Sequence, residues 1–124
     1  MKRLVATLIL TLPTSPVWAV TTLTTGSISM TQSTASVFET ECTAVNVSTK
    51  PLAVLLVLYT HDGTALVTGG STLGPQQETA ILSSVVTDDV HCTVTFSGSS
   101  KSVRGAMVVI DNTNFKPLSA LPAQ

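Results

Sequence analysis

Residues 90–97 read Val-His-Cys-Thr-Val-Thr-Phe-Ser, and apolar and polar side chains alternate along this stretch. Successive side chains of a β-strand point to opposite faces, so the pattern predicts a strand with one buried and one exposed face. If Cys92 points into the core, three neighbours at even spacing join it there: Val90, Val94 and Phe96. The positions between them form the exposed face: His91, Thr93 and Thr95. Such a strand is typical of a sheet that covers a core on one side only.

The chain on either side of this strand has a similar character. It is rich in Thr, Ser and Val, which suit pleated strands, and its short apolar runs are separated by the turn-forming residues Gly, Pro, Asn and Asp. About seven strands are predicted: 26–32, 37–47, 52–60, 65–68, 78–85, 90–97 and 103–110. Residues 117–124 are expected to form a loose tail. The predicted fold class is an all-β antiparallel sandwich, built by one domain over residues 20–124.

Residues 1–19 differ from this domain. Two basic residues, an apolar run of about nine residues, two prolines and small residues at positions 17 and 19 follow one another. This order is typical of a secretory signal peptide cleaved after Ala19, whereas the alternative is a buried N-terminal segment of a cytosolic protein. The apolar run is shorter than the ~20 residues that span a bilayer as a helix. We therefore expect an exported protein, periplasmic or extracellular, with no membrane insertion of residues 20–124.

The chain contains two cysteines, Cys42 and Cys92. An even number of cysteines in an exported chain favours a disulfide bond between them. Two free thiols or two metal ligands are the alternatives, but no Cys-x-x-Cys motif or nearby pair of histidines supports a metal.

With about seven strands and its cysteines on the second and sixth, the chain resembles an immunoglobulin-like β-sandwich, in which a disulfide joins those strands across the two sheets. Two features of antibody domains are missing, since residues 52–60 contain no Trp and position 90 is Val rather than Tyr. The chain is more similar to small exported bacterial sandwich proteins of unassigned function. The resemblance implies that the third, sixth and seventh strands are neighbours in one sheet.

Two predicted strands carry more apolar residues than one buried face needs, at 52–58 and 106–110. If both flank residues 90–97, their surplus side chains form one patch around a stripe of threonines. Exposed apolar patches usually mark interaction surfaces. The predicted interaction face consists of Leu55, Val57, Tyr59, Thr93, Thr95, Arg104, Ala106, Val108 and Ile110.

Two other interpretations of the same apolar residues remain open. Residues 20–32 or the C-terminal tail fold back over the patch, or a one-residue register slip exchanges the two faces. If the patch is a binding face, the substitutions Val57→Lys and Val108→Lys should leave the fold intact.

Charge and motifs argue against several function classes. Residues 20–124 hold four Lys and Arg against seven Asp and Glu, so the domain lacks the basic patch of a nucleic-acid-binding or membrane-surface protein. It has no Gly-x-Ser-x-Gly or Ser-x-x-Lys motif for a nucleophile, and no His-x-His or Glu-x-x-His spacing for a metal. No cofactor, metal or catalytic residue is expected. The residues from which an alternative metal site would be built are His61, Asp62, Asp88, Asp89 and His91.

We therefore expect a non-enzymatic exported protein that serves as a structural or protein-interaction module. Its partner would be another protein or a second copy of itself. One alternative is a periplasmic protein that binds a small ligand or a metal. Another is a fimbrial-type subunit, for which residues 20–32 would act as a strand donated to a neighbour.

Overall fold

The computed structural model describes residues 19–29, 38–84, 89–111 and 116–124. The regular elements in these ranges are β-strands: β1 (Val20–Thr24), β2 (Ile28–Ser29), β3 (Phe38–Asn46), β4 (Leu52–Thr60), β5 (Ala65–Leu73), β6 (Glu78–Ser83), β7 (Asp89–Ser97), β8 (Val103–Asp111) and β9 (Lys116–Pro122). No helix in the described part of the chain is long and apolar enough to cross a membrane. The predicted signal peptide lies outside the described residues, apart from Ala19.

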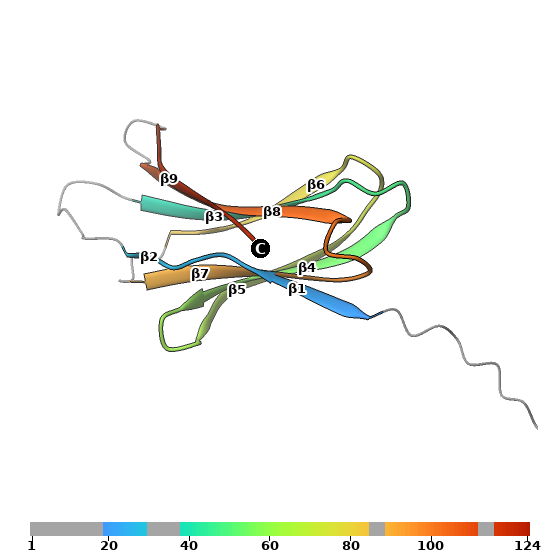
Figure 1. The fold of residues 1–124 in the computed structure, drawn as a ribbon. Coiled ribbons are helices and arrows are strands. Elements are labelled where there is room, and N and C mark those ends of the chain that lie inside the picture. Colours follow the sequence, from blue (N-terminus) through green and yellow to red (C-terminus); the bar gives the residue numbers. More distant parts are fainter. Residues whose placement is uncertain (1–18, 30–37, 85–88, 112–115) are drawn as a thin grey trace, which may run out of the picture.

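The strands form two antiparallel sheets packed face to face, which confirms the predicted sandwich (Figure 1). Sheet A has the order β1-β7-β4-β5, and β2 also pairs with β7. Sheet B has the order β6-β3-β8-β9. Consecutive strands often lie in different sheets, so the fold depends on contacts between residues that are far apart in sequence.

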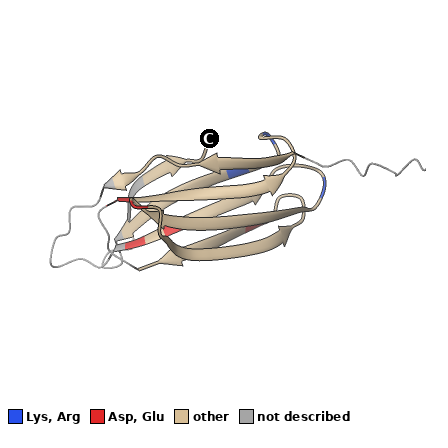
Figure 2. Cartoon of the chain, turned by 90° about the horizontal axis from the view of Figure 1, so that it is seen from below, with Lys and Arg blue, Asp and Glu red and all other residues tan. Residues whose placement is uncertain are grey.

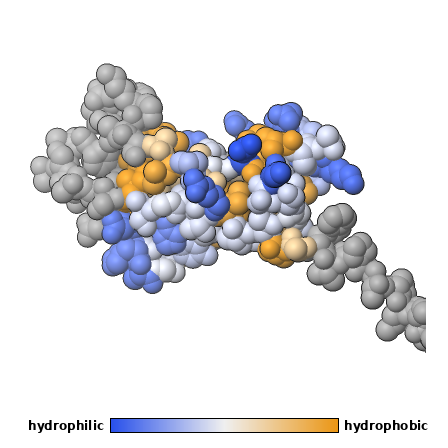
Figure 3. Space-filling model, in the orientation of Figure 1, coloured by the Kyte–Doolittle hydropathy of each residue, from blue (hydrophilic) through white to orange (hydrophobic). Residues whose placement is uncertain are grey.

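The core lies between the sheets and follows the predicted alternation. On β7, Val90, Cys92, Val94 and Phe96 are almost completely buried, which confirms the predicted inner face. The inner face of β4 is formed by alternate residues from Leu52 to Leu58, as predicted. Elsewhere on the molecule, apolar residues reach the surface in separate patches among polar ones (Figure 3).

The predicted disulfide is confirmed. Cys42 on β3 and Cys92 on β7 are bonded, and their Cα atoms are 6.1 Å apart. Because β3 belongs to sheet B and β7 to sheet A, the bond ties the two layers together through the core. Both cysteines are inaccessible to solvent.

The prediction that the third, sixth and seventh strands share one sheet is wrong for the last of them. β4 and β7 are neighbours in sheet A, but β8 lies in sheet B beside β3. The edge of β7 is already occupied by β1, which hydrogen bonds along it and reaches the following turn through Gly98 N–H and Ala19 C=O. The chain after β7 therefore crosses to the other layer, where Val47 N–H donates to Ser102 C=O.

The ends of the domain are more ordered than predicted. The predicted loose tail, residues 117–124, contains most of β9, which pairs with β8 at the edge of sheet B. The first strand begins at Val20 rather than at residue 26. Backbone bonds in both directions between Thr24 and Gln124 join the end of β1 to the residue that follows β9 by two positions, and close this side of the sandwich.

β5 is also longer than predicted, since Gly69 and Gly70 do not end it. It continues to Leu73 along the edge of sheet A. Gly69 lies on the core side of β5, opposite Leu56, and a Cβ atom there would come within 2.5 Å of Ile81 Cγ2 on β6. The absent side chain therefore lets the two sheets approach each other at this edge.

Candidate interaction face

The outer face of sheet A carries hydroxyl and apolar side chains from four adjacent strands. In the pairing order β1, β7, β4 and β5, the register assigns these residues to the face: Val20, Thr22 and Thr24; Thr93, Thr95 and Ser97; Ala53, Leu55, Val57 and Tyr59; Thr68, Gly70 and Thr72. We call this set the sheet A face. None of these residues carries a formal charge at neutral pH. His91 and Asp89 continue the outward-facing positions of β7 beyond Thr93 and lie at one end of this face.

Leu55 lies at the centre of one row across this face. Its row runs from Thr22 through Thr95 to Leu55 and then to Gly70. The Oγ1 atoms of Thr22 and Thr95 are 3.2 Å apart, which holds these two hydroxyls together by a hydrogen bond. On the other side Gly70 has no side chain, so no neighbouring side chain covers the isobutyl group of Leu55 there and an open space remains.

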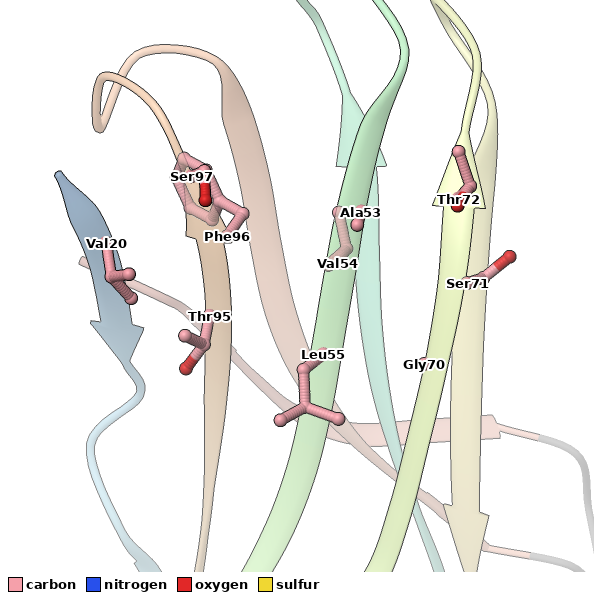
Figure 4. A pocket seen from close by; sticks show the side chains of 10 residues that line it. All are labelled: Val20, Ala53, Val54, Leu55, Gly70, Ser71, Thr72, Thr95, Phe96 and Ser97. Carbon is pink, nitrogen blue, oxygen red and sulfur yellow. The ribbon is translucent and has the colours of Figure 1, made fainter. Parts of the chain in front are cut away.

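That open space is part of a shallow depression of about 550 Å³. Figure 4 shows Val20, Thr95 and Leu55 along its length, with Ser71 and Thr72 on the β5 side. Leu55 is 43% exposed and Val20 is 68% exposed, so the depression combines accessible apolar carbons with a rim of hydroxyl groups. Wide, shallow surfaces of this composition suit contact with another protein better than enclosure of a small ligand.

The structure separates the predicted interaction face into two groups. Leu55, Val57, Tyr59, Thr93 and Thr95 lie together on sheet A, with their predicted outward orientation. The other four predicted residues lie on the outer face of sheet B, because β8 pairs with β3: Arg104, Ala106, Val108 and Ile110. The single patch predicted across β4, β7 and β8 is therefore not formed.

Sequence reasoning missed the contributions of β1 and β5 to the sheet A face. β1 takes the place expected for the last strand and brings Val20, Thr22 and Thr24. The stretch Val20–Thr24 is rich in β-branched residues, which favour strands, but residues 20–25 were not expected to form a strand. The segment considered as a donated strand thus begins by pairing with β7 of its own chain.

The two sheet faces differ in charge. Sheet B presents Glu39, Glu41 and Arg104 on the residues that alternate with its core positions. On the described outward positions of sheet A the charged residue is Asp89, at the start of β7 and away from Leu55. Figure 2 looks onto sheet A and shows that charged residues occupy few positions, while most of the strand surface is uncharged. An uncharged surface loses little solvation energy when another protein covers it.

Val57 and Leu55 should respond differently to substitution by lysine. Val57 is only 7% exposed although it lies on the outer face, so Val57→Lys should lower the free energy of unfolding by about 2 kcal/mol. Leu55→Lys, at a site 43% exposed, should change it by less than about 0.5 kcal/mol. Urea denaturation of both variants measures the difference. Equal losses would show that the burial of Val57 contributes nothing to stability.

The residues considered for a metal site do not form one in the described part of the chain. No three His, Cys, Asp or Glu side chains lie together there as a metal site requires. His61 is exposed at the tip of the β4–β5 hairpin, and the ring of His91 stacks on Tyr59 with centroids 5.3 Å apart. Asp88 lies outside the described residues.

The same hairpin tip holds a carboxylate with a shifted pKa. The hydroxyl of Thr60 donates a hydrogen bond to Asp62, and the backbone N–H of Thr64 donates to Asp62 Oδ1 at 3.1 Å. Chiefly because of the Thr60 bond, the pKa of Asp62 is lowered from 3.8 to about 2. Asp62 is fully exposed, and these bonds serve to fix the turn before Gly63, whose φ is 84°.

Removal of the Thr60 hydroxyl should raise the pKa of Asp62. In the native protein the carboxylate should titrate near pH 2, and in Thr60→Val its midpoint should move toward 3.8. A lowered pKa stabilises the folded state above the unfolded value, and this stabilisation is lost as pH falls from about 3.8 through about 2. NMR titration of the carboxyl carbon measures both midpoints. Thr22→Val, which removes a distant hydroxyl, should leave the Asp62 midpoint unchanged, and an unchanged midpoint in Thr60→Val would contradict the assignment.

The chain matches no known protein-family model, and no curated protein or solved structure is significantly similar to it. The sheets and the bond between them define the class of the molecule: it is a disulfide-bridged antiparallel β-sandwich protein. Its function must be inferred from its own surface.

Proposed function

We propose that this chain is an exported, non-enzymatic β-sandwich protein that acts as a structural or protein-interaction module through the sheet A face. The observation that carries the proposal is the exposure of Leu55 and Val20 on one uncharged, hydroxyl-rimmed surface. Large aliphatic side chains in such positions gain free energy when a partner removes them from water. The signal-like residues 1–19 support export, and the inter-sheet disulfide suits an oxidising compartment.

The geometry of the depression favours a protein partner. Its lining contains no titratable side chain and is composed of aliphatic, aromatic and hydroxyl groups and one glycine. A small polar ligand would need several convergent polar or charged groups, and a reaction would need a nucleophile beside a base. Short hydroxyl side chains around a central leucine instead match the polar rim and apolar centre of a protein interface.

Leu82 offers a matched control for testing this face. It is an exposed leucine, 52% accessible, but it lies on β6 in sheet B. The tagged native protein and its variants Leu55→Lys and Leu82→Lys should each be produced with residues 1–19 present, so that the cells can export them. Each tagged protein is then cross-linked to its neighbours and purified, and the proteins purified with it are compared. We expect a specific partner to be retained by the native protein and by Leu82→Lys, and to be lost from Leu55→Lys. Retention of the same partner by both variants, or of none by the native protein, would count against the sheet A face.

A further inference from the structure

The outer edge of β5 is unusual among the strand edges of this molecule. Within the described residues β5 pairs with β4 alone, so its other edge presents backbone N–H and C=O groups that no strand satisfies. The strand is nine residues long, Ala65–Leu73, and contains no charged residue and no proline. Its one printed irregularity is a register shift against β4 near its start, and the pairing is regular from Val67 to Leu73. Natural proteins usually protect a long edge strand with lysine, proline or a covering segment, because an unprotected edge pairs with other chains.

The other strands at the borders of the two sheets are protected in these ways. β9 contains Lys116 and two prolines, Pro117 and Pro122. β6 has six residues and begins with the charged Glu78. β1 has five residues, and Thr24 at its end is bonded to Gln124 of the same chain. β5 is therefore the edge whose sequence is suited to pairing with another strand.

Two apolar side chains at this edge are incompletely covered. Leu66 and Val67 on β5 pack against the buried cluster but remain partly exposed. On the opposite side of the sandwich Leu121 and Ala123 are also partly exposed, but there the backbone bonds between Thr24 and Gln124 connect the two sheets. A strand added beside β5 would cover both the free backbone groups and these two side chains.

We propose that the occupant of this edge is β5 of a second copy, paired antiparallel about a two-fold axis through Gly69. In an edge-to-edge pair the axis must pass through a residue position, because facing residues point to the same side of the sheet. Gly69 is the middle of the nine-residue strand. The register of β5 is regular from Val67 to Leu73 and shifts before Val67, so pairing about Gly69 joins residues 67–71 without irregularity. This pairing joins two sheets A into one continuous sheet and keeps the two cores on the same side.

The side chains along β5 fit this register. Thr68 faces the partner's Gly70 on the sheet A face, and Gly70 faces the partner's Thr68, so a β-branched side chain fills the space beside each glycine. On the core side, Val67 faces the partner's Ser71. No charges meet, because the strand has none. A strand of another protein would meet the same backbone groups, but only a second copy is certain to supply this complementary order of Thr and Gly.

This inference is separate from the proposed function, because it depends on backbone groups at the edge of sheet A rather than on Leu55 at the centre of its face. The two can fail independently. If Leu55→Lys loses a partner protein but remains dimeric, both hold. If the native protein is monomeric but retains a partner that Leu55→Lys loses, only the pairing of β5 is wrong.

Two double variants test the register directly. Thr68→Lys with Gly70→Lys places like charges opposite each other twice across the axis, and should weaken dimerisation by about 100-fold or more. Thr68→Lys with Gly70→Glu makes the same number of changes but places opposite charges together, and should keep the dimer. Gly70 has no left-handed φ, and a Cβ atom there makes only ordinary contacts with Val54 and Leu55. Both variants should therefore fold, which circular dichroism checks.

Sedimentation equilibrium of the purified, oxidised protein from micromolar to millimolar concentration measures the association. The expected result is a native dimer, loss of the dimer in the lysine–lysine variant, and its retention in the lysine–glutamate variant. A native protein that stays monomeric at every concentration would overturn the proposal. A dimer that survives the lysine–lysine substitution, or that is lost equally from both folded variants, would overturn the register about Gly69.

Discussion

Reduction of the Cys42–Cys92 disulfide should lower the free energy of unfolding by about 4 kcal/mol. The bond closes a loop with a sequence separation of 50 residues, and its main effect is to restrict the unfolded chain. A domain of this size is typically stable by ~5–15 kcal/mol, so the reduced protein should be only marginally folded. The bond is inaccessible to solvent, and the protein must therefore be unfolded before reduction and then refolded in the presence of reductant.

The measurement is urea denaturation of the oxidised and reduced protein under the same conditions. The double variant Cys42→Ala with Cys92→Ala is the control, because it removes the bond without leaving thiols that can oxidise again. It should lose at least as much stability as the reduced protein, since it also removes two sulfur atoms from the core. If the oxidised and the reduced protein unfold at the same urea concentration, the disulfide does not contribute to the free energy of unfolding.

The sequence was sufficient to predict which faces of β4, β7 and β8 are buried. Alternation along β7 assigned Cys92 and Phe96 to the core, and the exposed Arg104 assigned the faces of β8 correctly. These predictions succeed because side-chain direction depends on local backbone geometry, with a period of two residues. The disulfide was predicted for a different reason, namely an even number of cysteines in a chain that its first residues predict to be exported.

The neighbour of β8 could not be predicted by such local rules. A strand with one buried face has the same pattern in either layer of a sandwich, so Val103, Met107 and Val109 are buried equally well in sheet B. The resemblance to an immunoglobulin-like order placed β8 beside β7, but β1 occupies that position. Four of the nine residues of the predicted interaction face were therefore assigned to the wrong sheet, although their side chains point outward.

β9 was missed and β5 was predicted too short, because both sequences contain residues that usually end strands. Prolines 117 and 122 in β9 suggested a loose tail, yet proline is tolerated at a sheet edge, where one side of the strand needs no partner. Gly69 and Gly70 suggested a turn, but at the border of sheet A they allow close packing on Ile81 and leave space beside Leu55. Strand propensity therefore predicts the edge strands of a sheet less well than the central ones.

Asn46→Ala should lower the free energy of unfolding by about 3 kcal/mol, the largest effect expected from a single polar residue here. Asn46 is completely buried at the end of β3. Its Nδ2 donates to Lys50 C=O at 2.8 Å and to Leu73 C=O at 2.9 Å, while its Oδ1 accepts from Ser48 N–H at 2.9 Å. One amide therefore fixes the turn between β3 and β4 and links it to the end of β5 in the other sheet.

Ser48→Ala is the matched control for this prediction. It removes the Ser48 hydroxyl, which donates to Asn46 Oδ1 at 2.6 Å, but leaves the other three bonds of the amide in place. Its expected cost is about 1 kcal/mol, the usual value of one hydrogen bond. Both substitutions also destroy the Asn46-Val47-Ser48 glycosylation pattern, so a difference between them cannot come from a glycan. Urea denaturation should rank the proteins, from most to least stable, as native, Ser48→Ala and Asn46→Ala. Equal losses would show that the link between the two sheets made by the buried amide adds nothing to the free energy of unfolding.

The same contacts oppose glycosylation of the folded chain, because both hydrogens of the Asn46 amide are already donated inside the protein.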